Sequence, residues 1–150
     1  MLARSVLLVE DDDEVRNIVA EILTQNGFTV TSACDGLSAW DMLNSESFDL
    51  VITDMGLPGM NGEELLINMR KSSIGTPVIL ISAVKFKKGH PSYDDLSGYR
   101  LIHKPFEINE MKKIILDLLN EKIIPQNDNM RSIQIDNNND DLIIVNNIGS

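Results

Sequence analysis

Cysteine is nearly absent from this sequence, which holds only Cys34 among 150 residues. A single cysteine excludes an intramolecular disulfide and any zinc site built on CxxC pairs. Long apolar runs are absent as well. No stretch approaches the length of a membrane-spanning helix, and the run before Glu10 is too short for the core of a signal peptide. We therefore expect a cytoplasmic protein without a membrane partner.

Basic residues are also in the minority. Thirteen Lys and Arg stand against 23 Asp and Glu, which gives a formal net charge of −10 at pH 7. A surface of this sign repels nucleic acids and anionic lipids, so we expect no nucleic-acid partner. The length fits one domain, since chains this short seldom build two independent cores.

The last 30 residues differ in composition from the rest. Residues 121–150 contain seven asparagines, and Pro125 interrupts the preceding helix because it lacks an N–H group. We expect one domain over residues 1–120, followed by a flexible Asn/Asp-rich tail over 121–150 with no output domain. Two apolar fragments of the tail, 133–135 and 142–145, could each pair as a strand with a partner or with an exposed sheet edge.

Apolar runs and helical stripes alternate nearly five times along residues 1–120. Short apolar runs predict buried strands at 5–9, 28–33, 48–53, 77–81 and 100–103. Apolar residues at helical spacing predict helices at 15–23, 37–43, 65–69 and 108–119. Such alternation is typical of a parallel sheet with helices on both faces. We therefore predict a five-stranded, doubly wound α/β domain.

Two of the predicted helices have a defined stripe that we expect to face the sheet. In the first helix the stripe comprises Val15, Ile18, Val19, Ile22 and Leu23. Asp12 or Asp13 can cap its N-terminus, and Gly27 suits a left-handed stop after its last turn. In the second helix the stripe comprises Leu37, Trp40 and Leu43.

Acidic residues follow two of the predicted strands. Glu10 and Asp11 come after the first strand, and Asp54 comes after the third. All parallel strands end at one edge, so these carboxylates converge if strands one and three are neighbours in the order 2-1-3-4-5. Converging anions require a cation or a proton, and carboxylate oxygens at this density favour Mg²⁺. Taken singly, the same acids could also serve as a helix cap or start a turn.

Two further polar side chains follow the later strands. Ser82 comes after the fourth strand, and Lys104 comes after the fifth. Acids, a hydroxyl and an ammonium at successive strand ends can form a phosphoryl site. In it the metal and Lys104 offset negative charge, Ser82 donates to an oxygen, and Asp54 attacks phosphorus. Each residue alone reads as a strand-end polar group or a surface lysine, but their joint placement favours the site.

With these residues in place, the sequence resembles the receiver domain of bacterial two-component response regulators. The resemblance covers residues 4–120 and rests on four stretches in order, 6–12, 49–62, 81–83 and 104–106. It implies a flavodoxin-like fold and a part in phosphorelay signalling, with a sensor histidine kinase or a phosphotransfer protein as one partner and an unidentified downstream protein as the other.

The resemblance also implies roles for individual residues. Asp54 matches the phosphoacceptor, which takes a phosphoryl group from the phosphohistidine of a kinase. Glu10 and Asp11 match the acidic pair that holds Mg²⁺ together with Asp54, and the Gly56 carbonyl matches the backbone ligand of the ion. Ser82 matches the switch hydroxyl. Lys104 matches the family's lysine, whose peptide bond to the following proline is often cis.

The sequence departs from the family at two places, and two further positions bear on the lifetime of the phosphorylated state. Leu101 stands where the family usually has Tyr or Phe, which favours altered switching. Gly89-His90-Pro91 disfavours helical angles, so the fourth helix of the family, over 84–98, is expected to be a loop or a short displaced helix. Gly56 and Val84 match positions beside the path of the hydrolytic water, and neither side chain can orient it, so phospho-Asp54 is expected to be long-lived.

Three other functions remain open at this point. A pseudo-receiver would bind proteins without phosphorylation, and the altered residues over 84–101 favour it. The chain could also be the receiver part of a longer regulator or hybrid kinase. A phosphatase that uses an aspartyl phosphate would need a second acid two residues after Asp54, where Gly56 stands. We therefore expect a signalling domain rather than an enzyme.

Overall fold

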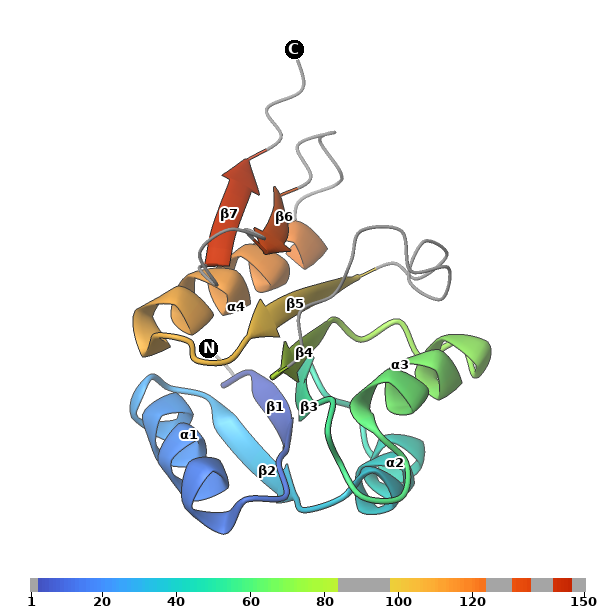
Figure 1. Cartoon of the computed structure of the whole chain (residues 1–150). Helices are drawn as coiled ribbons and strands as arrows, with labels where there is room; N and C mark the ends of the chain where they lie inside the picture. The colour runs from blue at the N-terminus through green and yellow to red at the C-terminus, as the bar shows by residue number, and fades with distance from the viewer. Residues whose placement is uncertain (1–2, 84–97, 124–130, 136–141, 147–150) are drawn as a thin grey trace.

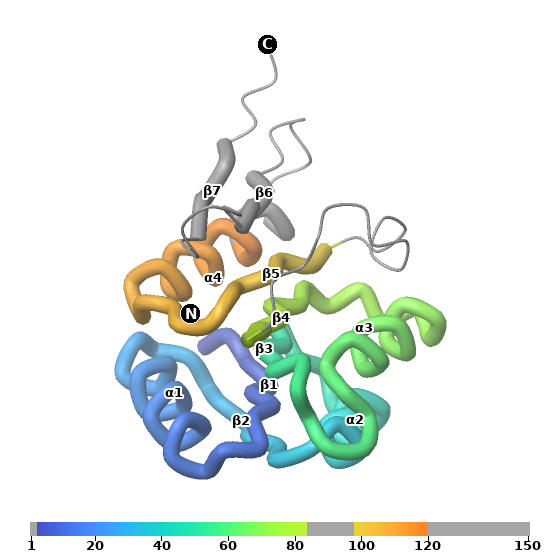
Figure 2. Tube along the Cα trace, viewed as in Figure 1, coloured from blue at the N-terminus to red at the C-terminus, as the bar shows by residue number. Residues whose placement is uncertain are grey.

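The computed structural model describes residues 3–83, 98–123, 131–135 and 142–146 (Figures 1 and 2). Its elements are, in chain order, β1 (Ser5–Val9), α1 (Asp13–Gln25), β2 (Thr29–Ala33), α2 (Gly36–Ser45), β3 (Leu50–Asp54), α3 (Gly62–Lys71), β4 (Val78–Ser82), β5 (Tyr99–His103), α4 (Ile108–Ile123), β6 (Arg131–Ile135) and β7 (Leu142–Asn146). No helix among these residues combines the length and the apolar composition needed to cross a bilayer.

Five strands form one parallel sheet in the order β2-β1-β3-β4-β5, as predicted. Successive residues of a strand point to opposite faces, so each strand feeds two apolar clusters. Val6 and Leu8 belong to the cluster beneath α1 and α4, whereas Leu7 and Val9 belong to the cluster beneath α2 and α3. The fold is therefore doubly wound: of the described helices, α1 and α4 cover one face of the sheet, and α2 and α3 cover the other (Figure 1).

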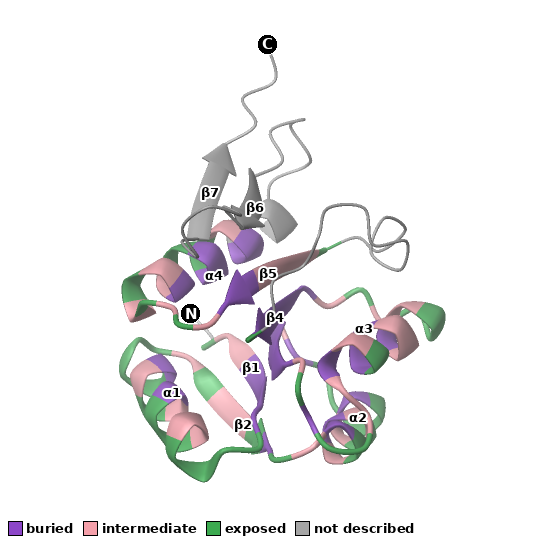
Figure 3. Cartoon of the chain, viewed as in Figure 1, coloured by how far each residue is buried: buried purple, intermediate pink, exposed green. Residues whose placement is uncertain are grey.

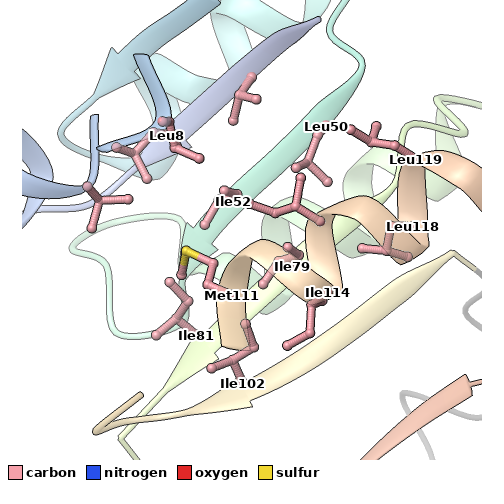
Figure 4. Close-up of a cluster of buried hydrophobic side chains, with 14 residues drawn as sticks. Leu8, Leu50, Ile52, Ile79, Ile81, Ile102, Met111, Ile114, Leu118 and Leu119 are labelled. Carbon is pink, nitrogen blue, oxygen red and sulfur yellow. The ribbon is translucent and has the colours of Figure 1, made fainter. Parts of the chain in front are cut away.

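The central strands are buried on both faces, which explains their continuous apolar runs. Every residue of β3 and of β4 is buried (Figure 3). Figure 4 shows one of the two clusters, in which Ile52 and Ile79 of the sheet lie beside Met111 and Ile114 of α4. This packing fixes the ends of β1, β3, β4 and β5 relative to one another, which is what positions the functional side chains.

Three helices begin at the same edge of the sheet with an acidic or amide cap. The side chains of Asp12, Asp35 and Asn61 each accept a hydrogen bond from the backbone N–H three residues later. The sequence left Asp12 and Asp13 as candidates for the cap of α1, and the structure shows that Asp12 is the cap. After α1, Gly27 adopts a φ of 90°, the left-handed conformation predicted for its end.

Two residues of the predicted stripes do not face the sheet. Ile18 is 50% exposed and Leu37 is 58% exposed. Helix α1 meets the sheet through Val19 and Leu23, a narrower stripe than the sequence predicted. In α2 the first turn contacts the loop after β3 through Gly36, which leaves the neighbouring Leu37 outside the core.

Part of the predicted tail is described, over residues 131–135 and 142–146. Its two apolar fragments form β6 and β7, which pair with each other in antiparallel fashion, Ile133 opposite Ile144. Both fragments thus form strands, as the sequence suggested, and the strand that each one meets is the other fragment. Helix α4 ends at Ile123, three residues beyond the domain boundary predicted at residue 120 and two residues before Pro125. The predicted irregular helix over 84–98 falls, apart from its last residue, outside the described residues.

Candidate functional site

The four predicted polar positions meet at the carboxyl edge of the sheet. Glu10 directly follows β1, Asp54 ends β3, Ser82 ends β4, and Lys104 directly follows β5. The strand order places β3 between β1 and β4, so Asp54 lies at the centre of this group. Strands β1 and β3 are neighbours, and the carboxylates at their ends lie close together, as the sequence analysis expected.

Three carboxylates face one another at this edge. Glu10, Asp11 and Asp54 each offer an oxygen, and these oxygens all lie within 4.8 Å of one another. Glu10 and Asp54 are buried, with 4% and 7% of their surface exposed, whereas Asp11 is exposed. One side of the cluster is therefore open to solvent, and the other is closed by the protein.

The Lys104 ammonium lies against the same carboxylates. Its Nζ is 2.6 Å from Asp54 Oδ2 and 4.0 Å from Glu10 Oε2. The second oxygen of Asp54, Oδ1, accepts a hydrogen bond of 2.9 Å from the backbone N–H of Gly56. Burial alone would raise the pKa of Asp54. The contacts with Lys104, Gly56 and Glu10 outweigh burial and lower this pKa below its usual range.

The pKa of Glu10 shifts in the opposite direction to that of Asp54. Burial, followed by the hydrogen bond and the charge of Asp54, raises the pKa of Glu10 to about 7, and Lys104 compensates only in part. Below about pH 7, a proton on Glu10 therefore reduces the repulsion between the two buried carboxylates. A divalent cation could take over that role, because it would neutralise the same oxygens.

The donor set fits Mg²⁺. This ion prefers carboxylate oxygens, keeps several waters and needs only a few protein ligands. Glu10, Asp11 and Asp54 supply such oxygens, and the exposed side of Asp11 leaves room for water. The Gly56 carbonyl stays a predicted ligand, since the described contacts of this residue involve its N–H.

Ser82 and the peptide after Lys104 complete the edge. Ser82 is 2% exposed at the end of β4, and its carbonyl accepts a hydrogen bond of 2.6 Å from the Lys104 N–H. The bond between Lys104 and Pro105 is cis. Leu101 of β5 packs against the apolar cluster beneath α2 and α3. An aliphatic side chain thus lies where the resemblance expected an aromatic ring.

Two glycines allow the loop after Asp54 to pack closely. A Cβ on Gly62 would lie 2.4 Å from the Asp54 carbonyl oxygen, and a Cβ on Gly36 would lie 1.8 Å from the Met60 carbonyl oxygen. Only glycine permits such approaches between backbones. The sequence alone did not reveal that these two glycines allow the loop carrying Gly56 to pack closely against the domain.

Arg16 is a further residue at this edge that sequence patterns did not reveal. Its guanidinium donates to the Glu10 carbonyl oxygen at 2.9 Å and also pairs with Asp13. The helical pattern of α1 identifies apolar positions, and it carries no information on where a polar residue between them reaches. The contact between Arg16 and the Glu10 carbonyl depends on the conformation of the loop between β1 and α1, which only the structure shows.

Comparison with protein families gives one assignment. The family model of the response regulator receiver domain matches residues 6–116. The match includes every residue proposed for the site, from Glu10 to Lys104.

Curated relatives agree with it. Sporulation initiation phosphotransferase F of Bacillus subtilis is 30% identical over 115 residues, which cover 77% of this chain and 93% of that protein. The transcriptional regulatory protein TctD of Salmonella typhimurium is 33% identical over 114 residues, covering 76% of this chain and 51% of that protein. The chain spans about half the length of the curated relatives that are regulators of this kind.

Solved structures show the same fold. The receiver domain of Francisella response regulator 1452 is 30% identical with a TM-score of 0.69, and the match covers 79% of this chain and 98% of that one. Response regulator TrrA from Thermotoga maritima, solved in complex with Mg(2+)-BeF, is 28% identical with a TM-score of 0.68, covering 77% and 98%. Given the matched family model, these relatives and the shared fold, this chain belongs to the response regulator receiver domain family.

Proposed function

We propose that this domain accepts a phosphoryl group on Asp54 in an Mg²⁺-dependent reaction and thereby changes a surface that a partner protein reads. The observation that carries the proposal is the convergence of three carboxylates and the Lys104 ammonium around one point at the carboxyl edge of the sheet. A structural ion pair would need one acid and one base, whereas this site gathers three carboxylates beside one ammonium, an excess of negative charge that a cation can neutralise.

Each residue has a role in the proposed transfer. An oxygen of Asp54 attacks the phosphorus of a phosphohistidine, the bond from phosphorus to the imidazole nitrogen breaks, and its electron pair stays on the imidazole. Lys104 balances negative charge on the transferred group, and the Ser82 hydroxyl donates to one of its oxygens. Mg²⁺, held by Glu10, Asp11, Asp54 and the Gly56 carbonyl, would supply further charge neutralisation at these oxygens.

The partners follow from this reaction. The donor is a sensor histidine kinase or a phosphotransfer protein, and the receiver of the signal is a downstream protein that recognises the changed surface. The curated relative named a phosphotransferase and the structural relative solved with Mg(2+)-BeF support this assignment. We propose no nucleic-acid contact for this chain, because its net charge of −10 opposes one.

Mass spectrometry after treatment with acetyl phosphate and Mg²⁺ tests the proposal. The native protein should gain the mass of one phosphoryl group, and Asp54→Ala should gain none. Asp41→Ala, which removes an exposed carboxylate from α2, is the matched control and should be phosphorylated like the native protein. A native protein that stays unmodified would support the pseudo-receiver, and rapid release of inorganic phosphate from small phosphoesters would support a phosphatase.

A further inference from the structure

The loop between β1 and α1 carries two of the proposed metal ligands, Glu10 and Asp11, on consecutive residues. The carbonyl group of Glu10 belongs to the peptide plane that joins them. The orientation of this plane sets ψ of Glu10 and φ of Asp11, and therefore the directions of both side chains. Whatever holds this carbonyl also holds the two acids in their relative positions.

Arg16 holds it. The Arg16 Nη1 donates to the Glu10 carbonyl oxygen at 2.9 Å, and its Nη2 pairs with Asp13 in the first turn of α1. The Arg16 side chain is only 17% exposed, so the guanidinium is fixed rather than free in solvent. On the other side of Glu10, its N–H donates to the Ala33 carbonyl oxygen at 3.1 Å. Both peptide groups of Glu10 are thus tied to the domain.

We propose that Arg16 is a positioning residue for the metal site, which acts by fixing the peptide plane between Glu10 and Asp11. The inference rests on the proposed Mg²⁺ site. The charge of Arg16 and its positioning role have opposite effects on the affinity for Mg²⁺. As a nearby positive charge, Arg16 opposes the binding of a cation, so its removal should tighten Mg²⁺ on electrostatic grounds alone. As a positioning residue it favours binding, so its removal should weaken Mg²⁺.

The two possibilities are separated by titrating the full chain with Mg²⁺ and following backbone amide signals by NMR. Arg16→Met keeps the apolar stem of the side chain and removes its donors. Groups that orient metal ligands typically contribute tenfold or more to affinity, so we expect the Mg²⁺ dissociation constant to rise on the order of tenfold. Arg16→Lys should recover part of the loss, because an ammonium can also donate to the Glu10 carbonyl.

A second arginine provides the matched control. Arg70 is half-buried at the end of α3, where it donates to the carbonyl oxygens of Ile74 and Thr76, far from the carboxyl edge. Arg70→Met should lower the thermal midpoint and leave the Mg²⁺ affinity unchanged. Asp13→Asn tests the ion pair separately and should change the affinity less than Arg16→Met, because the Glu10 contact remains.

The outcomes are distinct. An unchanged or tighter Mg²⁺ dissociation constant in Arg16→Met, with a native protein that binds Mg²⁺, overturns the role of Arg16 and leaves the proposed function intact. A native protein that binds no Mg²⁺ overturns the proposed function itself. If Arg16→Met does not fold, Arg16→Gln, whose amide is too short to reach the carbonyl, repeats the measurement with the same expectation.

Discussion

Two aspartates flank the same strand, and their surroundings differ completely. Asp49 precedes β3 and accepts hydrogen bonds from the backbone N–H of Ser5 at 2.8 Å and from its hydroxyl at 3.3 Å. Asp54 ends β3 and meets Lys104 together with the carboxylates of Glu10 and Asp11. At the amino edge of the sheet, Asp49 accepts hydrogen bonds from neutral donors. At the carboxyl edge, three carboxylates lie beside one ammonium group.

The difference shows what makes an acidic residue functional in this fold. The hydrogen bonds to Asp49 join the starts of two neighbouring strands. They are contacts within the protein and involve no cluster of acids that a ligand would have to neutralise. Below about pH 7 a proton on Glu10 reduces the negative charge beside Asp54, because the pKa of Glu10 is raised to about 7, and a cation can replace that proton. Substitutions at the carboxyl edge should therefore change phosphorylation and Mg²⁺ binding, whereas a substitution at the amino edge should change only the stability of the fold.

The largest effect is expected from removing the base at the carboxyl edge. Lys104→Met should slow phosphorylation of Asp54 by acetyl phosphate by about a hundredfold, because removing one preorganised charge at the reacting group has an effect of this size. The rate is measured by mass spectrometry in saturating Mg²⁺. Lys113→Met removes an exposed lysine of α4 and should react at the native rate. Equal rates for the two variants would contradict the role of Lys104.

The second prediction concerns pH and Glu10. The pKa of Glu10 is raised from its ordinary value of 4.5 to about 7, so the folded protein binds this proton more tightly than the unfolded one. In the absence of Mg²⁺, the stability that this proton supplies should be lost as the pH rises from about 4.5 to about 7. Thermal denaturation across this range measures it, and Glu10→Gln should flatten the profile.

The same proton should oppose Mg²⁺. Below about pH 7 the ion must displace it, so the Mg²⁺ affinity should fall roughly tenfold for each pH unit, and binding should release a proton. Calorimetry in two buffers of different ionisation enthalpy counts that proton. Binding that is independent of pH between 5 and 7 would show that Glu10 does not take part.

The third prediction addresses the amino edge. Asp49→Ala leaves the N–H of Ser5 without its acceptor and should lower the free energy of unfolding by about 2 kcal/mol. It should leave the rate of phosphorylation and the Mg²⁺ affinity unchanged. Urea denaturation and the acetyl phosphate assay report the two quantities separately. A loss of phosphorylation in a folded Asp49→Ala protein would mean that the two edges are coupled.

The smallest effect concerns the lifetime of the phosphorylated state. A Cβ on Gly56 would lie 3.6 Å from Asp54 Oδ1, an ordinary contact, so a side chain fits beside the phosphoacceptor. Gly56→Asn would place an amide where it can orient a water, and phospho-Asp54 should then decay several-fold faster. Gly75→Asn is the control, since a Cβ there meets nothing within 4 Å. Equal lifetimes would show that Gly56 does not protect the acyl phosphate.

The sequence predicted those features that follow from strand order and strand ends. The apolar runs located every strand of the five-stranded sheet, and Glu10, Asp54, Ser82 and Lys104 lie at the carboxyl ends of four of these strands, as predicted. The alternation of elements predicted a parallel, doubly wound sheet, and the order followed from placing strands one and three side by side so that their terminal carboxylates converge. These are local and topological features, and one sequence carries them.

Features that depend on how side chains reach across the fold were not predictable. The stripe of α1 included Ile18, but the angle at which the helix meets the sheet leaves this residue half-exposed. The pairing of β6 with β7 depends on which free edge each fragment meets, and apolar composition does not specify that. The raised pKa of Glu10 depends on burial and on Asp54, which is 44 residues away in the chain.

The central claim is that the oxygens of the carboxyl edge surround one divalent ion beside Asp54. A crystal structure of the full chain with Mg²⁺ and beryllofluoride tests it most directly. The account predicts a beryllofluoride group on Asp54, in contact with Lys104 and Ser82, and an ion held by Glu10, Asp11, Asp54 and the Gly56 carbonyl. An empty edge under conditions that saturate other receiver domains would contradict it.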